Sequence, residues 1–390
     1  MDNKRLGITW QLSDTHGWGI FGLNLVVNLI SLTDTKPLLF SKPHFQNVSA
    51  EKMIQLQPLI DEQKQVQTGV IDRAGNQKVS VNGVPILHAL ANGFRCRDRI
   101  RGQKNIGFIF FEEGNIDDIA RQRAQDYELI LAGSSWNRDY ARSNGITNIE
   151  YISQGIDTDI FKPGITSGNY EGRFTIFSGG KLELRKGQDI VLAAFKAFHT
   201  HHPDALLITS WRNAWPGSAL GMINSTHISS DPEIGLNGEI NIENWAAANG
   251  VDPSAFVDLG WVPNSMMPEI LHDMDVAVFP NRCEGGTNLV AMEAMACGIP
   301  TILSANTGHL DLLMADNCFP LLDQAVVTSE TSPHEMWRES RVEEIVEQLE
   351  FVYQNREESR YRAENGALSM ASMSWAHQTR KLMQAIQKWI

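Results

Sequence analysis

Short apolar runs alternate with longer amphipathic segments along most of this chain. In the first half, buried strands are predicted at residues 6–12, 37–40, 85–88, 106–111 and 149–152, with a further strand starting at Leu129. In the second half, the corresponding runs lie at 174–177, 205–211, 256–262, 275–280 and 301–303. Helices are predicted at 23–32, 188–199, 266–274, 287–297, 341–355 and 375–390. This alternation predicts an α/β protein with parallel sheets.

The stretch from Asn281 to Pro300 carries the clearest local signature. It follows the strand predicted at 275–280, and a Gly-x-Pro sequence at its end stops the predicted helix. An acidic, glycine-rich loop therefore lies where a strand passes into a helix, which is the ligand-facing edge of an open α/β sheet. The N–H groups at a helix start favour anions. With Glu284 in the loop and Glu293 in the helix, the stretch predicts a site for phosphate and sugar hydroxyls.

A second strand–loop–helix junction is rich in cations. Glycines at 179 and 180 are followed by Lys181, Arg185 and Lys186, and then by the helix predicted at 188–199. Such a junction suits a diphosphate, which needs both N–H donors and full positive charges. The Gly-Lys-Ser/Thr spacing of a Walker loop is missing. Surface lysines at a helix start remain the alternative interpretation.

A glycine motif follows the first predicted strand. Gly17-x-Gly19-x-x-Gly22 matches the dinucleotide-binding pattern and opens a helix. The next strand, at 37–40, ends in Ser-Lys-Pro and offers no acidic residue for ribose hydroxyls. Three interpretations stay open: a nicotinamide cofactor, a loop that lets phosphates of another ligand approach the backbone, and tight strand–helix packing alone.

Polar residues also follow two predicted strands of the first half. His88 ends one strand and Glu112-Glu113 follows another, where side chains face the crevice of such a sheet. Neighbouring side chains alternate in an extended chain, so only one of the two glutamates is expected to point inward. A structural role for His88 stays open. The basic segment Arg95–Lys104 is interpreted as a solvated loop or as a patch for an anionic acceptor or a membrane surface.

Composition narrows the class of protein. Residues 1–165 hold 18 basic and 18 acidic residues, so residues 166–390 carry the whole net charge of -13. An acidic chain argues against general nucleic-acid binding. We expect no secretion signal and no transmembrane segment, because the longest apolar stretch, at 20–32, is too short and contains polar residues. Four cysteines without a CxxC pair favour reduced thiols and a cytoplasmic location.

The motifs together resemble the retaining GT-B glycosyltransferases of family 4, over nearly the whole chain. Those that carry the resemblance are Gly17–Gly22, Ser134–Asn137, Gly155–Pro163, Gly180–Gly187, Leu259–Pro263 and Glu284–Gly298. The resemblance implies two Rossmann-like domains facing across a cleft. It places an acceptor-side domain at 1–165, a donor domain at 166–374, and a C-terminal helix at 375–390 that crosses back to the first domain. The Gly/Ser/Asn-rich segment 163–172 is the predicted hinge.

The resemblance also implies roles for single residues. Lys186, and Lys181 where the family usually has Arg, would neutralise the diphosphate together with Arg185. Glu293 would hold the ribose hydroxyls, and Trp261-Val262 would cradle the base. The loop at Gly17 and Gly19 would meet the phosphates. The donor sugar would be held by Glu284 and by the backbone of Gly285, Gly286, Thr287, Asn288 and Leu289.

Two departures from the family pattern concern these roles. Eight residues separate Glu284 from Glu293, one more than is usual. We expect a one-residue bulge at Gly285-Gly286, because glycine permits the backbone angles that a bulge requires. The usual His-Asp after the fifth strand is replaced by Glu112-Glu113. The candidate catalytic residues are Lys181, Lys186 and Glu284 in the second half of the chain, and His88 and Glu113 in the first half.

The resemblance thus implies a retaining transfer of a hexose from a UDP- or GDP-linked donor to a hydroxyl of a saccharide or glycoconjugate. No metal and no cofactor are expected, since two cations and a helix N-terminus can stabilise the departing diphosphate. The alternatives are an NAD(P)-dependent oxidoreductase that uses the Gly17–Gly22 loop, and a catalytically silent protein that binds nucleotide sugars.

Overall fold

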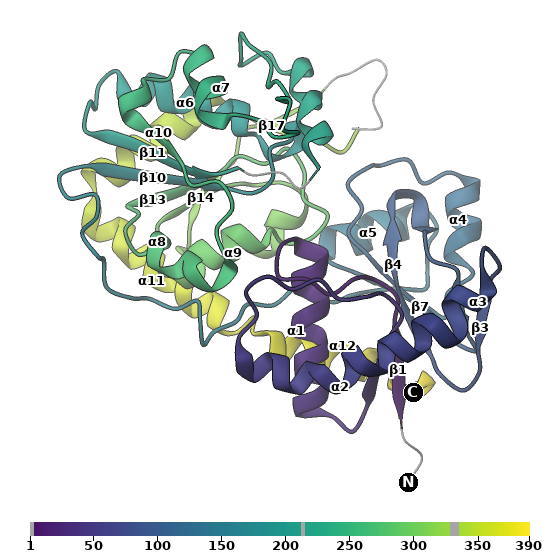
Figure 1. The fold of residues 1–390 in the computed structure, drawn as a ribbon. Helices are drawn as coiled ribbons and strands as arrows, with labels where there is room; N and C mark the ends of the chain where they lie inside the picture. The colour runs from purple at the N-terminus through teal and green to yellow at the C-terminus, as the bar shows by residue number, and fades with distance from the viewer. Residues whose placement is uncertain (1–3, 212–214, 328–334) are drawn as a thin grey trace. The chain divides into compact units, whose positions relative to one another are not determined.

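A computed structural model describes residues 4–211, 215–327 and 335–390. The chain divides into two compact units (Figure 1). The first comprises Met1–Gly155 and Met373–Ile390, and the second comprises Ile156–Ser372. Each unit contains a sheet of parallel strands with helices, which confirms the predicted α/β class. The sequence placed the division at residue 165, ten residues beyond the observed one.

The first unit is built on a mainly parallel sheet with the order β2-β1-β4-β7-β8-β9, and β5 is added antiparallel to β4. Its strands are β1 (Arg5–Ile8), β2 (Lys36–Leu39), β4 (Ile86–Ala91), β5 (Arg95–Cys96), β7 (Asn105–Ile109), β8 (Leu129–Ala132) and β9 (Ile149–Tyr151). A short parallel pair, β3 (Val79–Val81) and β6 (Ile100–Gly102), lies outside this sheet. Its helices are α1 (Gly17–Leu32), α2 (Ala50–Val66), α3 (Asp72–Ala74), α4 (Asp118–Ala124), α5 (Ser135–Ser143) and α12 (Trp375–Ile386).

The C-terminal helix α12 completes the first unit. It packs beside α1, and the rings of Phe21 and Trp375 lie 5.9 Å apart. Ser134 begins α5 by accepting a hydrogen bond from the backbone N–H of Asn137, as Ser-x-x helix starts do. The predicted return of the C-terminal helix to the first domain is confirmed.

The second unit contains a six-stranded parallel sheet with the order β12-β11-β10-β13-β14-β15. Its strands are β10 (Phe174–Gly179), β11 (Ala205–Ser210), β12 (Phe256–Asp258), β13 (Val276–Phe279), β14 (Thr301–Ser304) and β15 (Phe319–Leu321). Chain order runs outward from β10 on one side and from β13 on the other. The carboxyl ends of β10 and β13 therefore form the switch point at which such sheets bind ligands.

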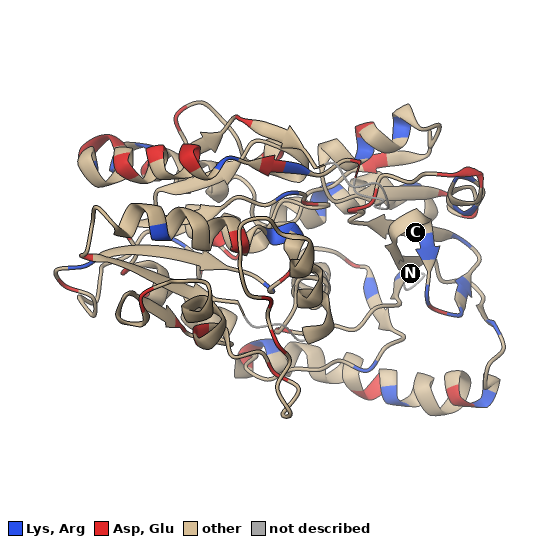
Figure 2. Cartoon of the chain, turned by 90° about the horizontal axis from the view of Figure 1, so that it is seen from above, with Lys and Arg blue, Asp and Glu red and all other residues tan. Residues whose placement is uncertain are grey.

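Helices and short turns surround this sheet. They are α6 (Gln188–His199), α7 (Ile242–Ala248), α8 (Met267–Leu271), α9 (Leu289–Ala296), α10 (Val342–Gln354) and α11 (Arg356–Ala371), with a hairpin of β16 (Gln324–Val326) and β17 (Arg338–Ser340). Strands β10, β11 and β13 are buried along their whole length or nearly so, which explains their continuous apolar runs. Acidic and basic residues are interspersed along the exposed helices (Figure 2).

Several elements depart from the predicted pattern. The helices α2, α3, α4, α7 and α11 were not predicted. Helix α2 buries only Leu56 and Gln63, and α11 buries Ser359, Ala363, Gly366 and Met370, so neither presents the apolar stripe by which helices are recognised. The segment 163–172 is tied to the second unit, because Asp273 accepts hydrogen bonds from Thr166, Ser167, Gly168 and Asn169.

Candidate functional site

Two loops meet at the switch point of the second unit. Residues 180–187 connect β10 to α6, and residues 280–288 connect β13 to α9. Gly187 joins them closely: it has φ 73°, and a Cβ there would overlap the carbonyl oxygen of Pro280. Only glycine satisfies both requirements. The two stretches that the sequence singled out separately are therefore neighbours in space.

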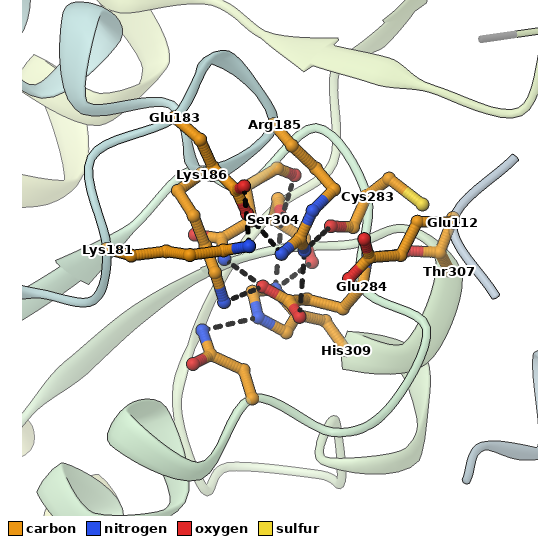
Figure 3. Close-up of polar contacts among 12 residues, drawn as sticks. Glu112, Lys181, Glu183, Arg185, Lys186, Cys283, Glu284, Ser304, Thr307 and His309 are labelled. Carbon is orange, nitrogen blue, oxygen red and sulfur yellow. Dashed lines mark hydrogen bonds and ion pairs between the residues drawn. The ribbon is translucent and has the colours of Figure 1, made fainter. Parts of the chain in front are cut away.

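A buried ion-pair cluster lies where these loops meet (Figure 3). The Lys186 Nζ donates to Glu284 Oε1 at 2.5 Å, and Arg185 Nη1 lies 3.1 Å from Glu284 Oε2. Arg185 also donates to Glu183, which binds Lys181 Nζ through its second oxygen at 2.8 Å. The side chains of Arg185 and Glu284 are each 6% exposed. The predicted residues Lys181, Arg185, Lys186 and Glu284 thus form one network. Glu183, which was not predicted, completes it.

The cations keep Glu284 ionised. Burial alone would raise the pKa of this carboxyl, but the charges of Lys186 and Arg185 outweigh it and lower the pKa to about 2. Its backbone is fixed as well, since Glu284 N–H donates to Thr307 Oγ1 at 2.8 Å and Gly308 N–H donates to Glu284 O at 3.0 Å. Glu284 lies with the cations, as a carboxylate that shares the site with a diphosphate would.

We expected a bulge at Gly285-Gly286, but the unusual backbone angles of this loop lie at another residue. The left-handed residue is Asn288, with φ 63° and ψ 91°, directly before α9. Asparagine tolerates this region better than most residues because its short side chain can bond locally. Across from the loop, Thr307 has φ 41°, and a Cβ on Gly308 would overlap Gly286 O. The loop thus has its positive φ at Asn288 and packs closely against Thr307-Gly308.

His309 holds Asn288 in this conformation. Its Nδ1 lies 3.0 Å from Ser304 Oγ and 3.3 Å from Ser304 O, and its Nε2 lies 3.1 Å from Asn288 Nδ2. Nδ1 faces a carbonyl oxygen, which accepts, and Nε2 faces an amide nitrogen, which donates. The ring proton therefore lies on Nδ1. Burial lowers the pKa of His309 to about 4, so the ring is neutral at neutral pH. Strain of this kind gathers at ligand sites that must be held in one shape.

A second buried network lies behind the cation turn. Arg282 is 1% exposed, and its guanidinium donates to Asp189 Oδ1 and Oδ2 at 2.8 and 2.7 Å, to Glu339 Oε2 at 2.7 Å, and to Leu184 O at 2.6 Å. Its backbone N–H donates to Arg185 O at 2.7 Å. Arg282 therefore fixes the backbone of the turn Leu184–Lys186 that carries the cations.

Glu293 lies inside α9 and is not part of the ion-pair cluster. It is 5% exposed, and its Oε1 accepts from Asn264 Nδ2 at 2.6 Å. Burial raises the pKa of Glu293 to about 8, against a weaker lowering by the Asn264 hydrogen bond. Asn264 follows the half-buried residues Trp261 and Val262, so the segment predicted to hold a base is tied to the residue predicted to hold ribose.

The raised pKa of Glu293 predicts a pH dependence of stability. The folded pKa of about 8 exceeds the ordinary value of 4.5, so this group favours folding most below pH ~4.5, and its contribution is lost as the pH rises through 8. Glu293→Gln, which can still accept from Asn264, should therefore gain stability relative to wild type on going from about pH 5 to about pH 9. Urea unfolding at both pH values measures this. The exposed Glu269→Gln should show no such trend, and a pH-independent difference for Glu293→Gln would contradict the assignment.

Residues 285–288 form the rest of the loop between β13 and α9, and Leu289 begins α9. Gly285, Gly286, Thr287, Asn288 and Leu289 are all buried, and Thr287 Oγ1 contacts Met292 Sδ at 3.0 Å inside α9. Asn288 is the N-cap of α9 and makes no side-chain capping bond there. The predicted loop is thus a rigid segment that leads directly into a helix N-terminus.

In the first unit, the glycine motif is partly explained by packing. A Cβ on Gly19 would lie 2.8 Å from Ser13 N, and a Cβ on Gly22 would lie 2.5 Å from Trp10 Nε1. Gly17 is exposed, with nothing near the position of a Cβ. The Gly19 N–H donates to His16 Nδ1 at 3.1 Å, which caps α1. Close packing of α1 against the loop that follows β1 accounts for Gly19 and Gly22, whereas Gly17 retains room for a ligand.

The structure places His88 and Glu113 differently from their expected strand-end positions. His88 is the third residue of β4, fully buried, and its Nδ1 lies 3.0 Å from Asp98 Oδ2. Glu113 is half-buried in the segment after β7, which ends at Ile109. Arg95–Lys104, interpreted as a solvated loop or a basic patch, contains the strands β5 and β6. His88 is thus interior to the sheet.

Several residues of the site were not identified from the sequence. They are Asn281, Arg282, Thr307, Gly308 and His309, which position the predicted ones. Asn281 donates to Glu284, and Gly308 permits the close approach of two loops. The Asn-Thr-Gly-His segment after β14 was the available signal, since it too follows the carboxyl end of a strand in the same sheet.

The comparisons with known proteins concern the family and the fold of this chain. Residues 241–382 match the family model "Family 4 Glycosyltransferase in conflict systems". Among solved structures, sucrose-phosphate synthase from Thermosynechococcus elongatus is similar, with a TM-score of 0.65 and 12% identity over 99% of this chain and 98% of the other. Anabaena HepE, solved with UDP and glucose, gives a TM-score of 0.63 and 11% identity over 99% of this chain and 100% of the other.

A glycosyltransferase from Rickettsia africae is similar too, with a TM-score of 0.60 and 10% identity over 100% of this chain and 99% of the other. No curated protein matches the sequence significantly. The similar folds extend over nearly the whole chain, whereas the family match covers part of the second unit and the first residues of the C-terminal segment that belongs to the first unit. In the part of the chain that the structure describes, no helix is both long and apolar enough to cross a membrane.

Proposed function

We propose that this chain, a glycosyltransferase of the family 4, GT-B type, transfers a hexose from a UDP- or GDP-linked donor to a hydroxyl acceptor with retention of anomeric configuration. The observation that carries the proposal is the buried cluster of Lys186, Arg185 and Glu284 at the switch point of the donor unit. This cluster offers cations for a diphosphate and a carboxylate for sugar hydroxyls within one site. Anabaena HepE, whose structure with UDP-glucose shares this fold, supports a nucleotide sugar as the donor.

The chemistry follows from the charges. As the glycosidic bond breaks, negative charge develops on the departing diphosphate, and Lys186, Arg185 and Lys181 are positioned to stabilise it. These cations are paired with Glu284 and Glu183 in the structure. A bound diphosphate would compete for them, which would release Glu284 toward the sugar. No cofactor and no metal are needed for this step in the proposal.

The acceptor is proposed to be a saccharide or glycoconjugate hydroxyl, received by the first unit. Attack from the face that the diphosphate leaves gives retention. We place the reaction in the cytoplasm because all four cysteines, at 96, 283, 297 and 318, are free thiols. Glu293 is proposed to accept hydrogen bonds from the ribose hydroxyls, and its raised pKa should then fall in the complex.

The proposal is tested by screening a panel of nucleotide sugars for thermal shift, followed by turnover with the donor that binds. A specific shift identifies the base and the sugar together. The anomeric configuration of the product, or of the sugar released by slow hydrolysis, is read by NMR at early times. Saturable donor binding without any sugar release would favour the silent binding protein, and saturable NADH binding would favour an oxidoreductase.

The role of Glu284 gives a separate prediction. Glu284→Gln should weaken binding of the nucleotide sugar relative to the free nucleoside diphosphate by ~10–100-fold, since a hydrogen bond to a charged group contributes about 1.5–3 kcal/mol. Affinity for the free diphosphate should be unchanged or higher, because Lys186 and Arg185 lose a competing anion. Calorimetric titration of both ligands measures this difference.

The matched control is Glu358→Gln, which removes an exposed glutamate that pairs with Arg362 in the same unit. It should leave both affinities at the wild-type level. Equal changes in the affinities for sugar nucleotide and free diphosphate in Glu284→Gln would assign the sugar contact to the backbone of residues 285–288 instead.

A further inference from the structure

A cluster of metal-ligating side chains lies in the first unit, apart from the residues proposed to bind the donor. His88 comes from β4, Cys96 from β5, and Asp98 from the turn that leads to β6. His88 Nδ1 lies 3.0 Å from Asp98 Oδ2 and 3.6 Å from Cys96 Sγ, and Cys96 Sγ lies 3.1 Å from Asp98 Oδ2. Three different donor atoms thus form a small triangle.

The size of the triangle fits a tetrahedral zinc ion. With Zn–N of ~2.05 Å, Zn–O of ~2.1 Å and Zn–S of ~2.3 Å, tetrahedral angles place such ligand atoms about 3.4–3.6 Å apart. One side of the observed triangle already has this length, and the other two need to lengthen by a few tenths of an ångström. Cys96 and Asp98 are partly exposed, which provides an entry path and a fourth position for solvent.

The surrounding hydrogen bonds are those that support metal ligands. His88 Nε2 lies 2.9 Å from Asn105 Oδ1, and that amide is oriented by Gly102, whose N–H donates to Oδ1 and whose carbonyl accepts from Nδ2. His88 therefore carries its proton on Nε2 and directs Nδ1 at the cluster. The second oxygen of Asp98 accepts from Ile100 N–H at 3.0 Å. Ligating histidines and carboxylates are fixed in this way by second partners.

We propose that His88 Nδ1, Cys96 Sγ and Asp98 Oδ2 bind one Zn²⁺ ion, with a water molecule as the fourth ligand. Zinc replaces the proton on Nδ1 and that on the thiol. A thiolate with an imidazole and a carboxylate is a donor set that zinc accepts and that magnesium does not prefer. The ion ties the β5–β6 segment to β4. It is not assigned to the transfer reaction, for which the sequence predicts no metal.

Two other interpretations of the cluster differ in geometry or outcome. A cysteine–histidine–aspartate relay requires the thiol and the carboxylate on opposite ring nitrogens, whereas both lie at Nδ1 here. The second is a buried imidazolium–carboxylate pair, in which a proton on Nδ1 takes the place of zinc. Arg101, whose Nη1 lies 3.5 Å from Asp98 Oδ1, and the Tyr127 hydroxyl on Cys96 belong to the surroundings in either case. Metal binding distinguishes the two.

The test uses the full chain, purified with its affinity tag removed. Elemental analysis should give close to one zinc per chain, and Co²⁺ added after chelation should produce the near-ultraviolet thiolate-to-cobalt band together with intense visible bands. Cys96→Ser should abolish the thiolate band. The control Cys318→Ala, a buried thiol of the second unit, should leave it unchanged.

A measurement on wild type keeps the test independent of the folding of a variant. Zinc should slow alkylation of Cys96 at least about tenfold, as read by peptide mass spectrometry, and chelation should lower Tm by a few degrees. Absence of stoichiometric zinc, no cobalt–thiolate band and unchanged alkylation of Cys96 would overturn the proposal. The cluster would then be the imidazolium–carboxylate pair.

Discussion

Replacing Lys186 with alanine should lower kcat/KM for the nucleotide sugar by ~10²–10³-fold, equivalent to about 2.7–4 kcal/mol of transition-state stabilisation. The reason is the position of this ammonium group, which is only 12% exposed and lies in the turn between β10 and α6. In such a site, a charge stabilises a developing anion far more than it would in water. The loss should appear mainly in kcat, because the charge on the diphosphate grows as the bond breaks. Steady-state kinetics with the identified donor measures it.

The control for this prediction is Lys196→Ala. Lys196 lies in the last turn of α6, the helix that follows the turn bearing Lys186. Its Nζ donates to the backbone carbonyl of Asn249. Its removal changes the net charge equally and should leave kcat/KM within about threefold of wild type. Turnover of Lys186→Ala at the wild-type rate with every nucleotide sugar would remove the diphosphate assignment and, with it, the reaction proposed here.

The sequence predicts much of the second unit because its signals are local. Helix α6 spans Gln188–His199, as predicted, since a glycine precedes it and an apolar face runs along it. Strands β10, β11 and β13 are buried continuous runs, which sequence patterns identify well. Helix α11 escaped prediction because it buries small and polar residues instead of an apolar stripe. A prediction from sequence is therefore most accurate where the neighbours of a residue in the chain determine the environment of its side chain.

The site was predicted only in part, for a physical reason. Lys186 and Glu284 were identified because each follows a strand and precedes a helix. Thr307, Gly308 and His309 act through contacts with a loop more than twenty residues away, at Glu284, Gly286 and Asn288, respectively. Such contacts depend on tertiary structure. The positive φ of the loop likewise lies at Asn288, whose side chain bonds to His309, and not at Gly285-Gly286, where the bulge was predicted.

For His88, the error lies in the predicted end of a strand. The predicted strand stopped at this residue, so a side chain at the crevice was expected. The structure continues β4 to Ala91, which places His88 in the sheet interior, where burial would normally favour a neutral ring. The Asp98 and Cys96 side chains reverse this balance and raise the pKa of His88 to about 9. An error of three residues in a strand end thus changed the inferred role of a residue.

Arg282 connects the stability of the second unit to the cation turn. Its guanidinium bonds Asp189 at the start of α6, Glu339 in β17 and the carbonyl of Leu184, so it joins three separate parts of the chain. Asp189 is fully buried and also accepts from Ser225 Oγ at 2.5 Å. Loss of the guanidinium would leave Asp189 as a buried charge without its main partner. Networks of this kind are costly to break from one side.

Arg282→Met should therefore lower the free energy of unfolding by about 3–5 kcal/mol, with urea unfolding as the measurement. Arg282→Met combined with Asp189→Asn should recover part of this loss, because the stranded charge is then removed as well. The control Arg341→Met, at a side chain that is 52% exposed and pairs with Asp323, should change stability by less than about 1 kcal/mol. Activity should fall in folded Arg282→Met too, since Leu184 O and the turn bearing Lys186 lose their anchor. A stable, fully active Arg282→Met would show that the turn is held by its own backbone, and that the network behind it contributes little to catalysis.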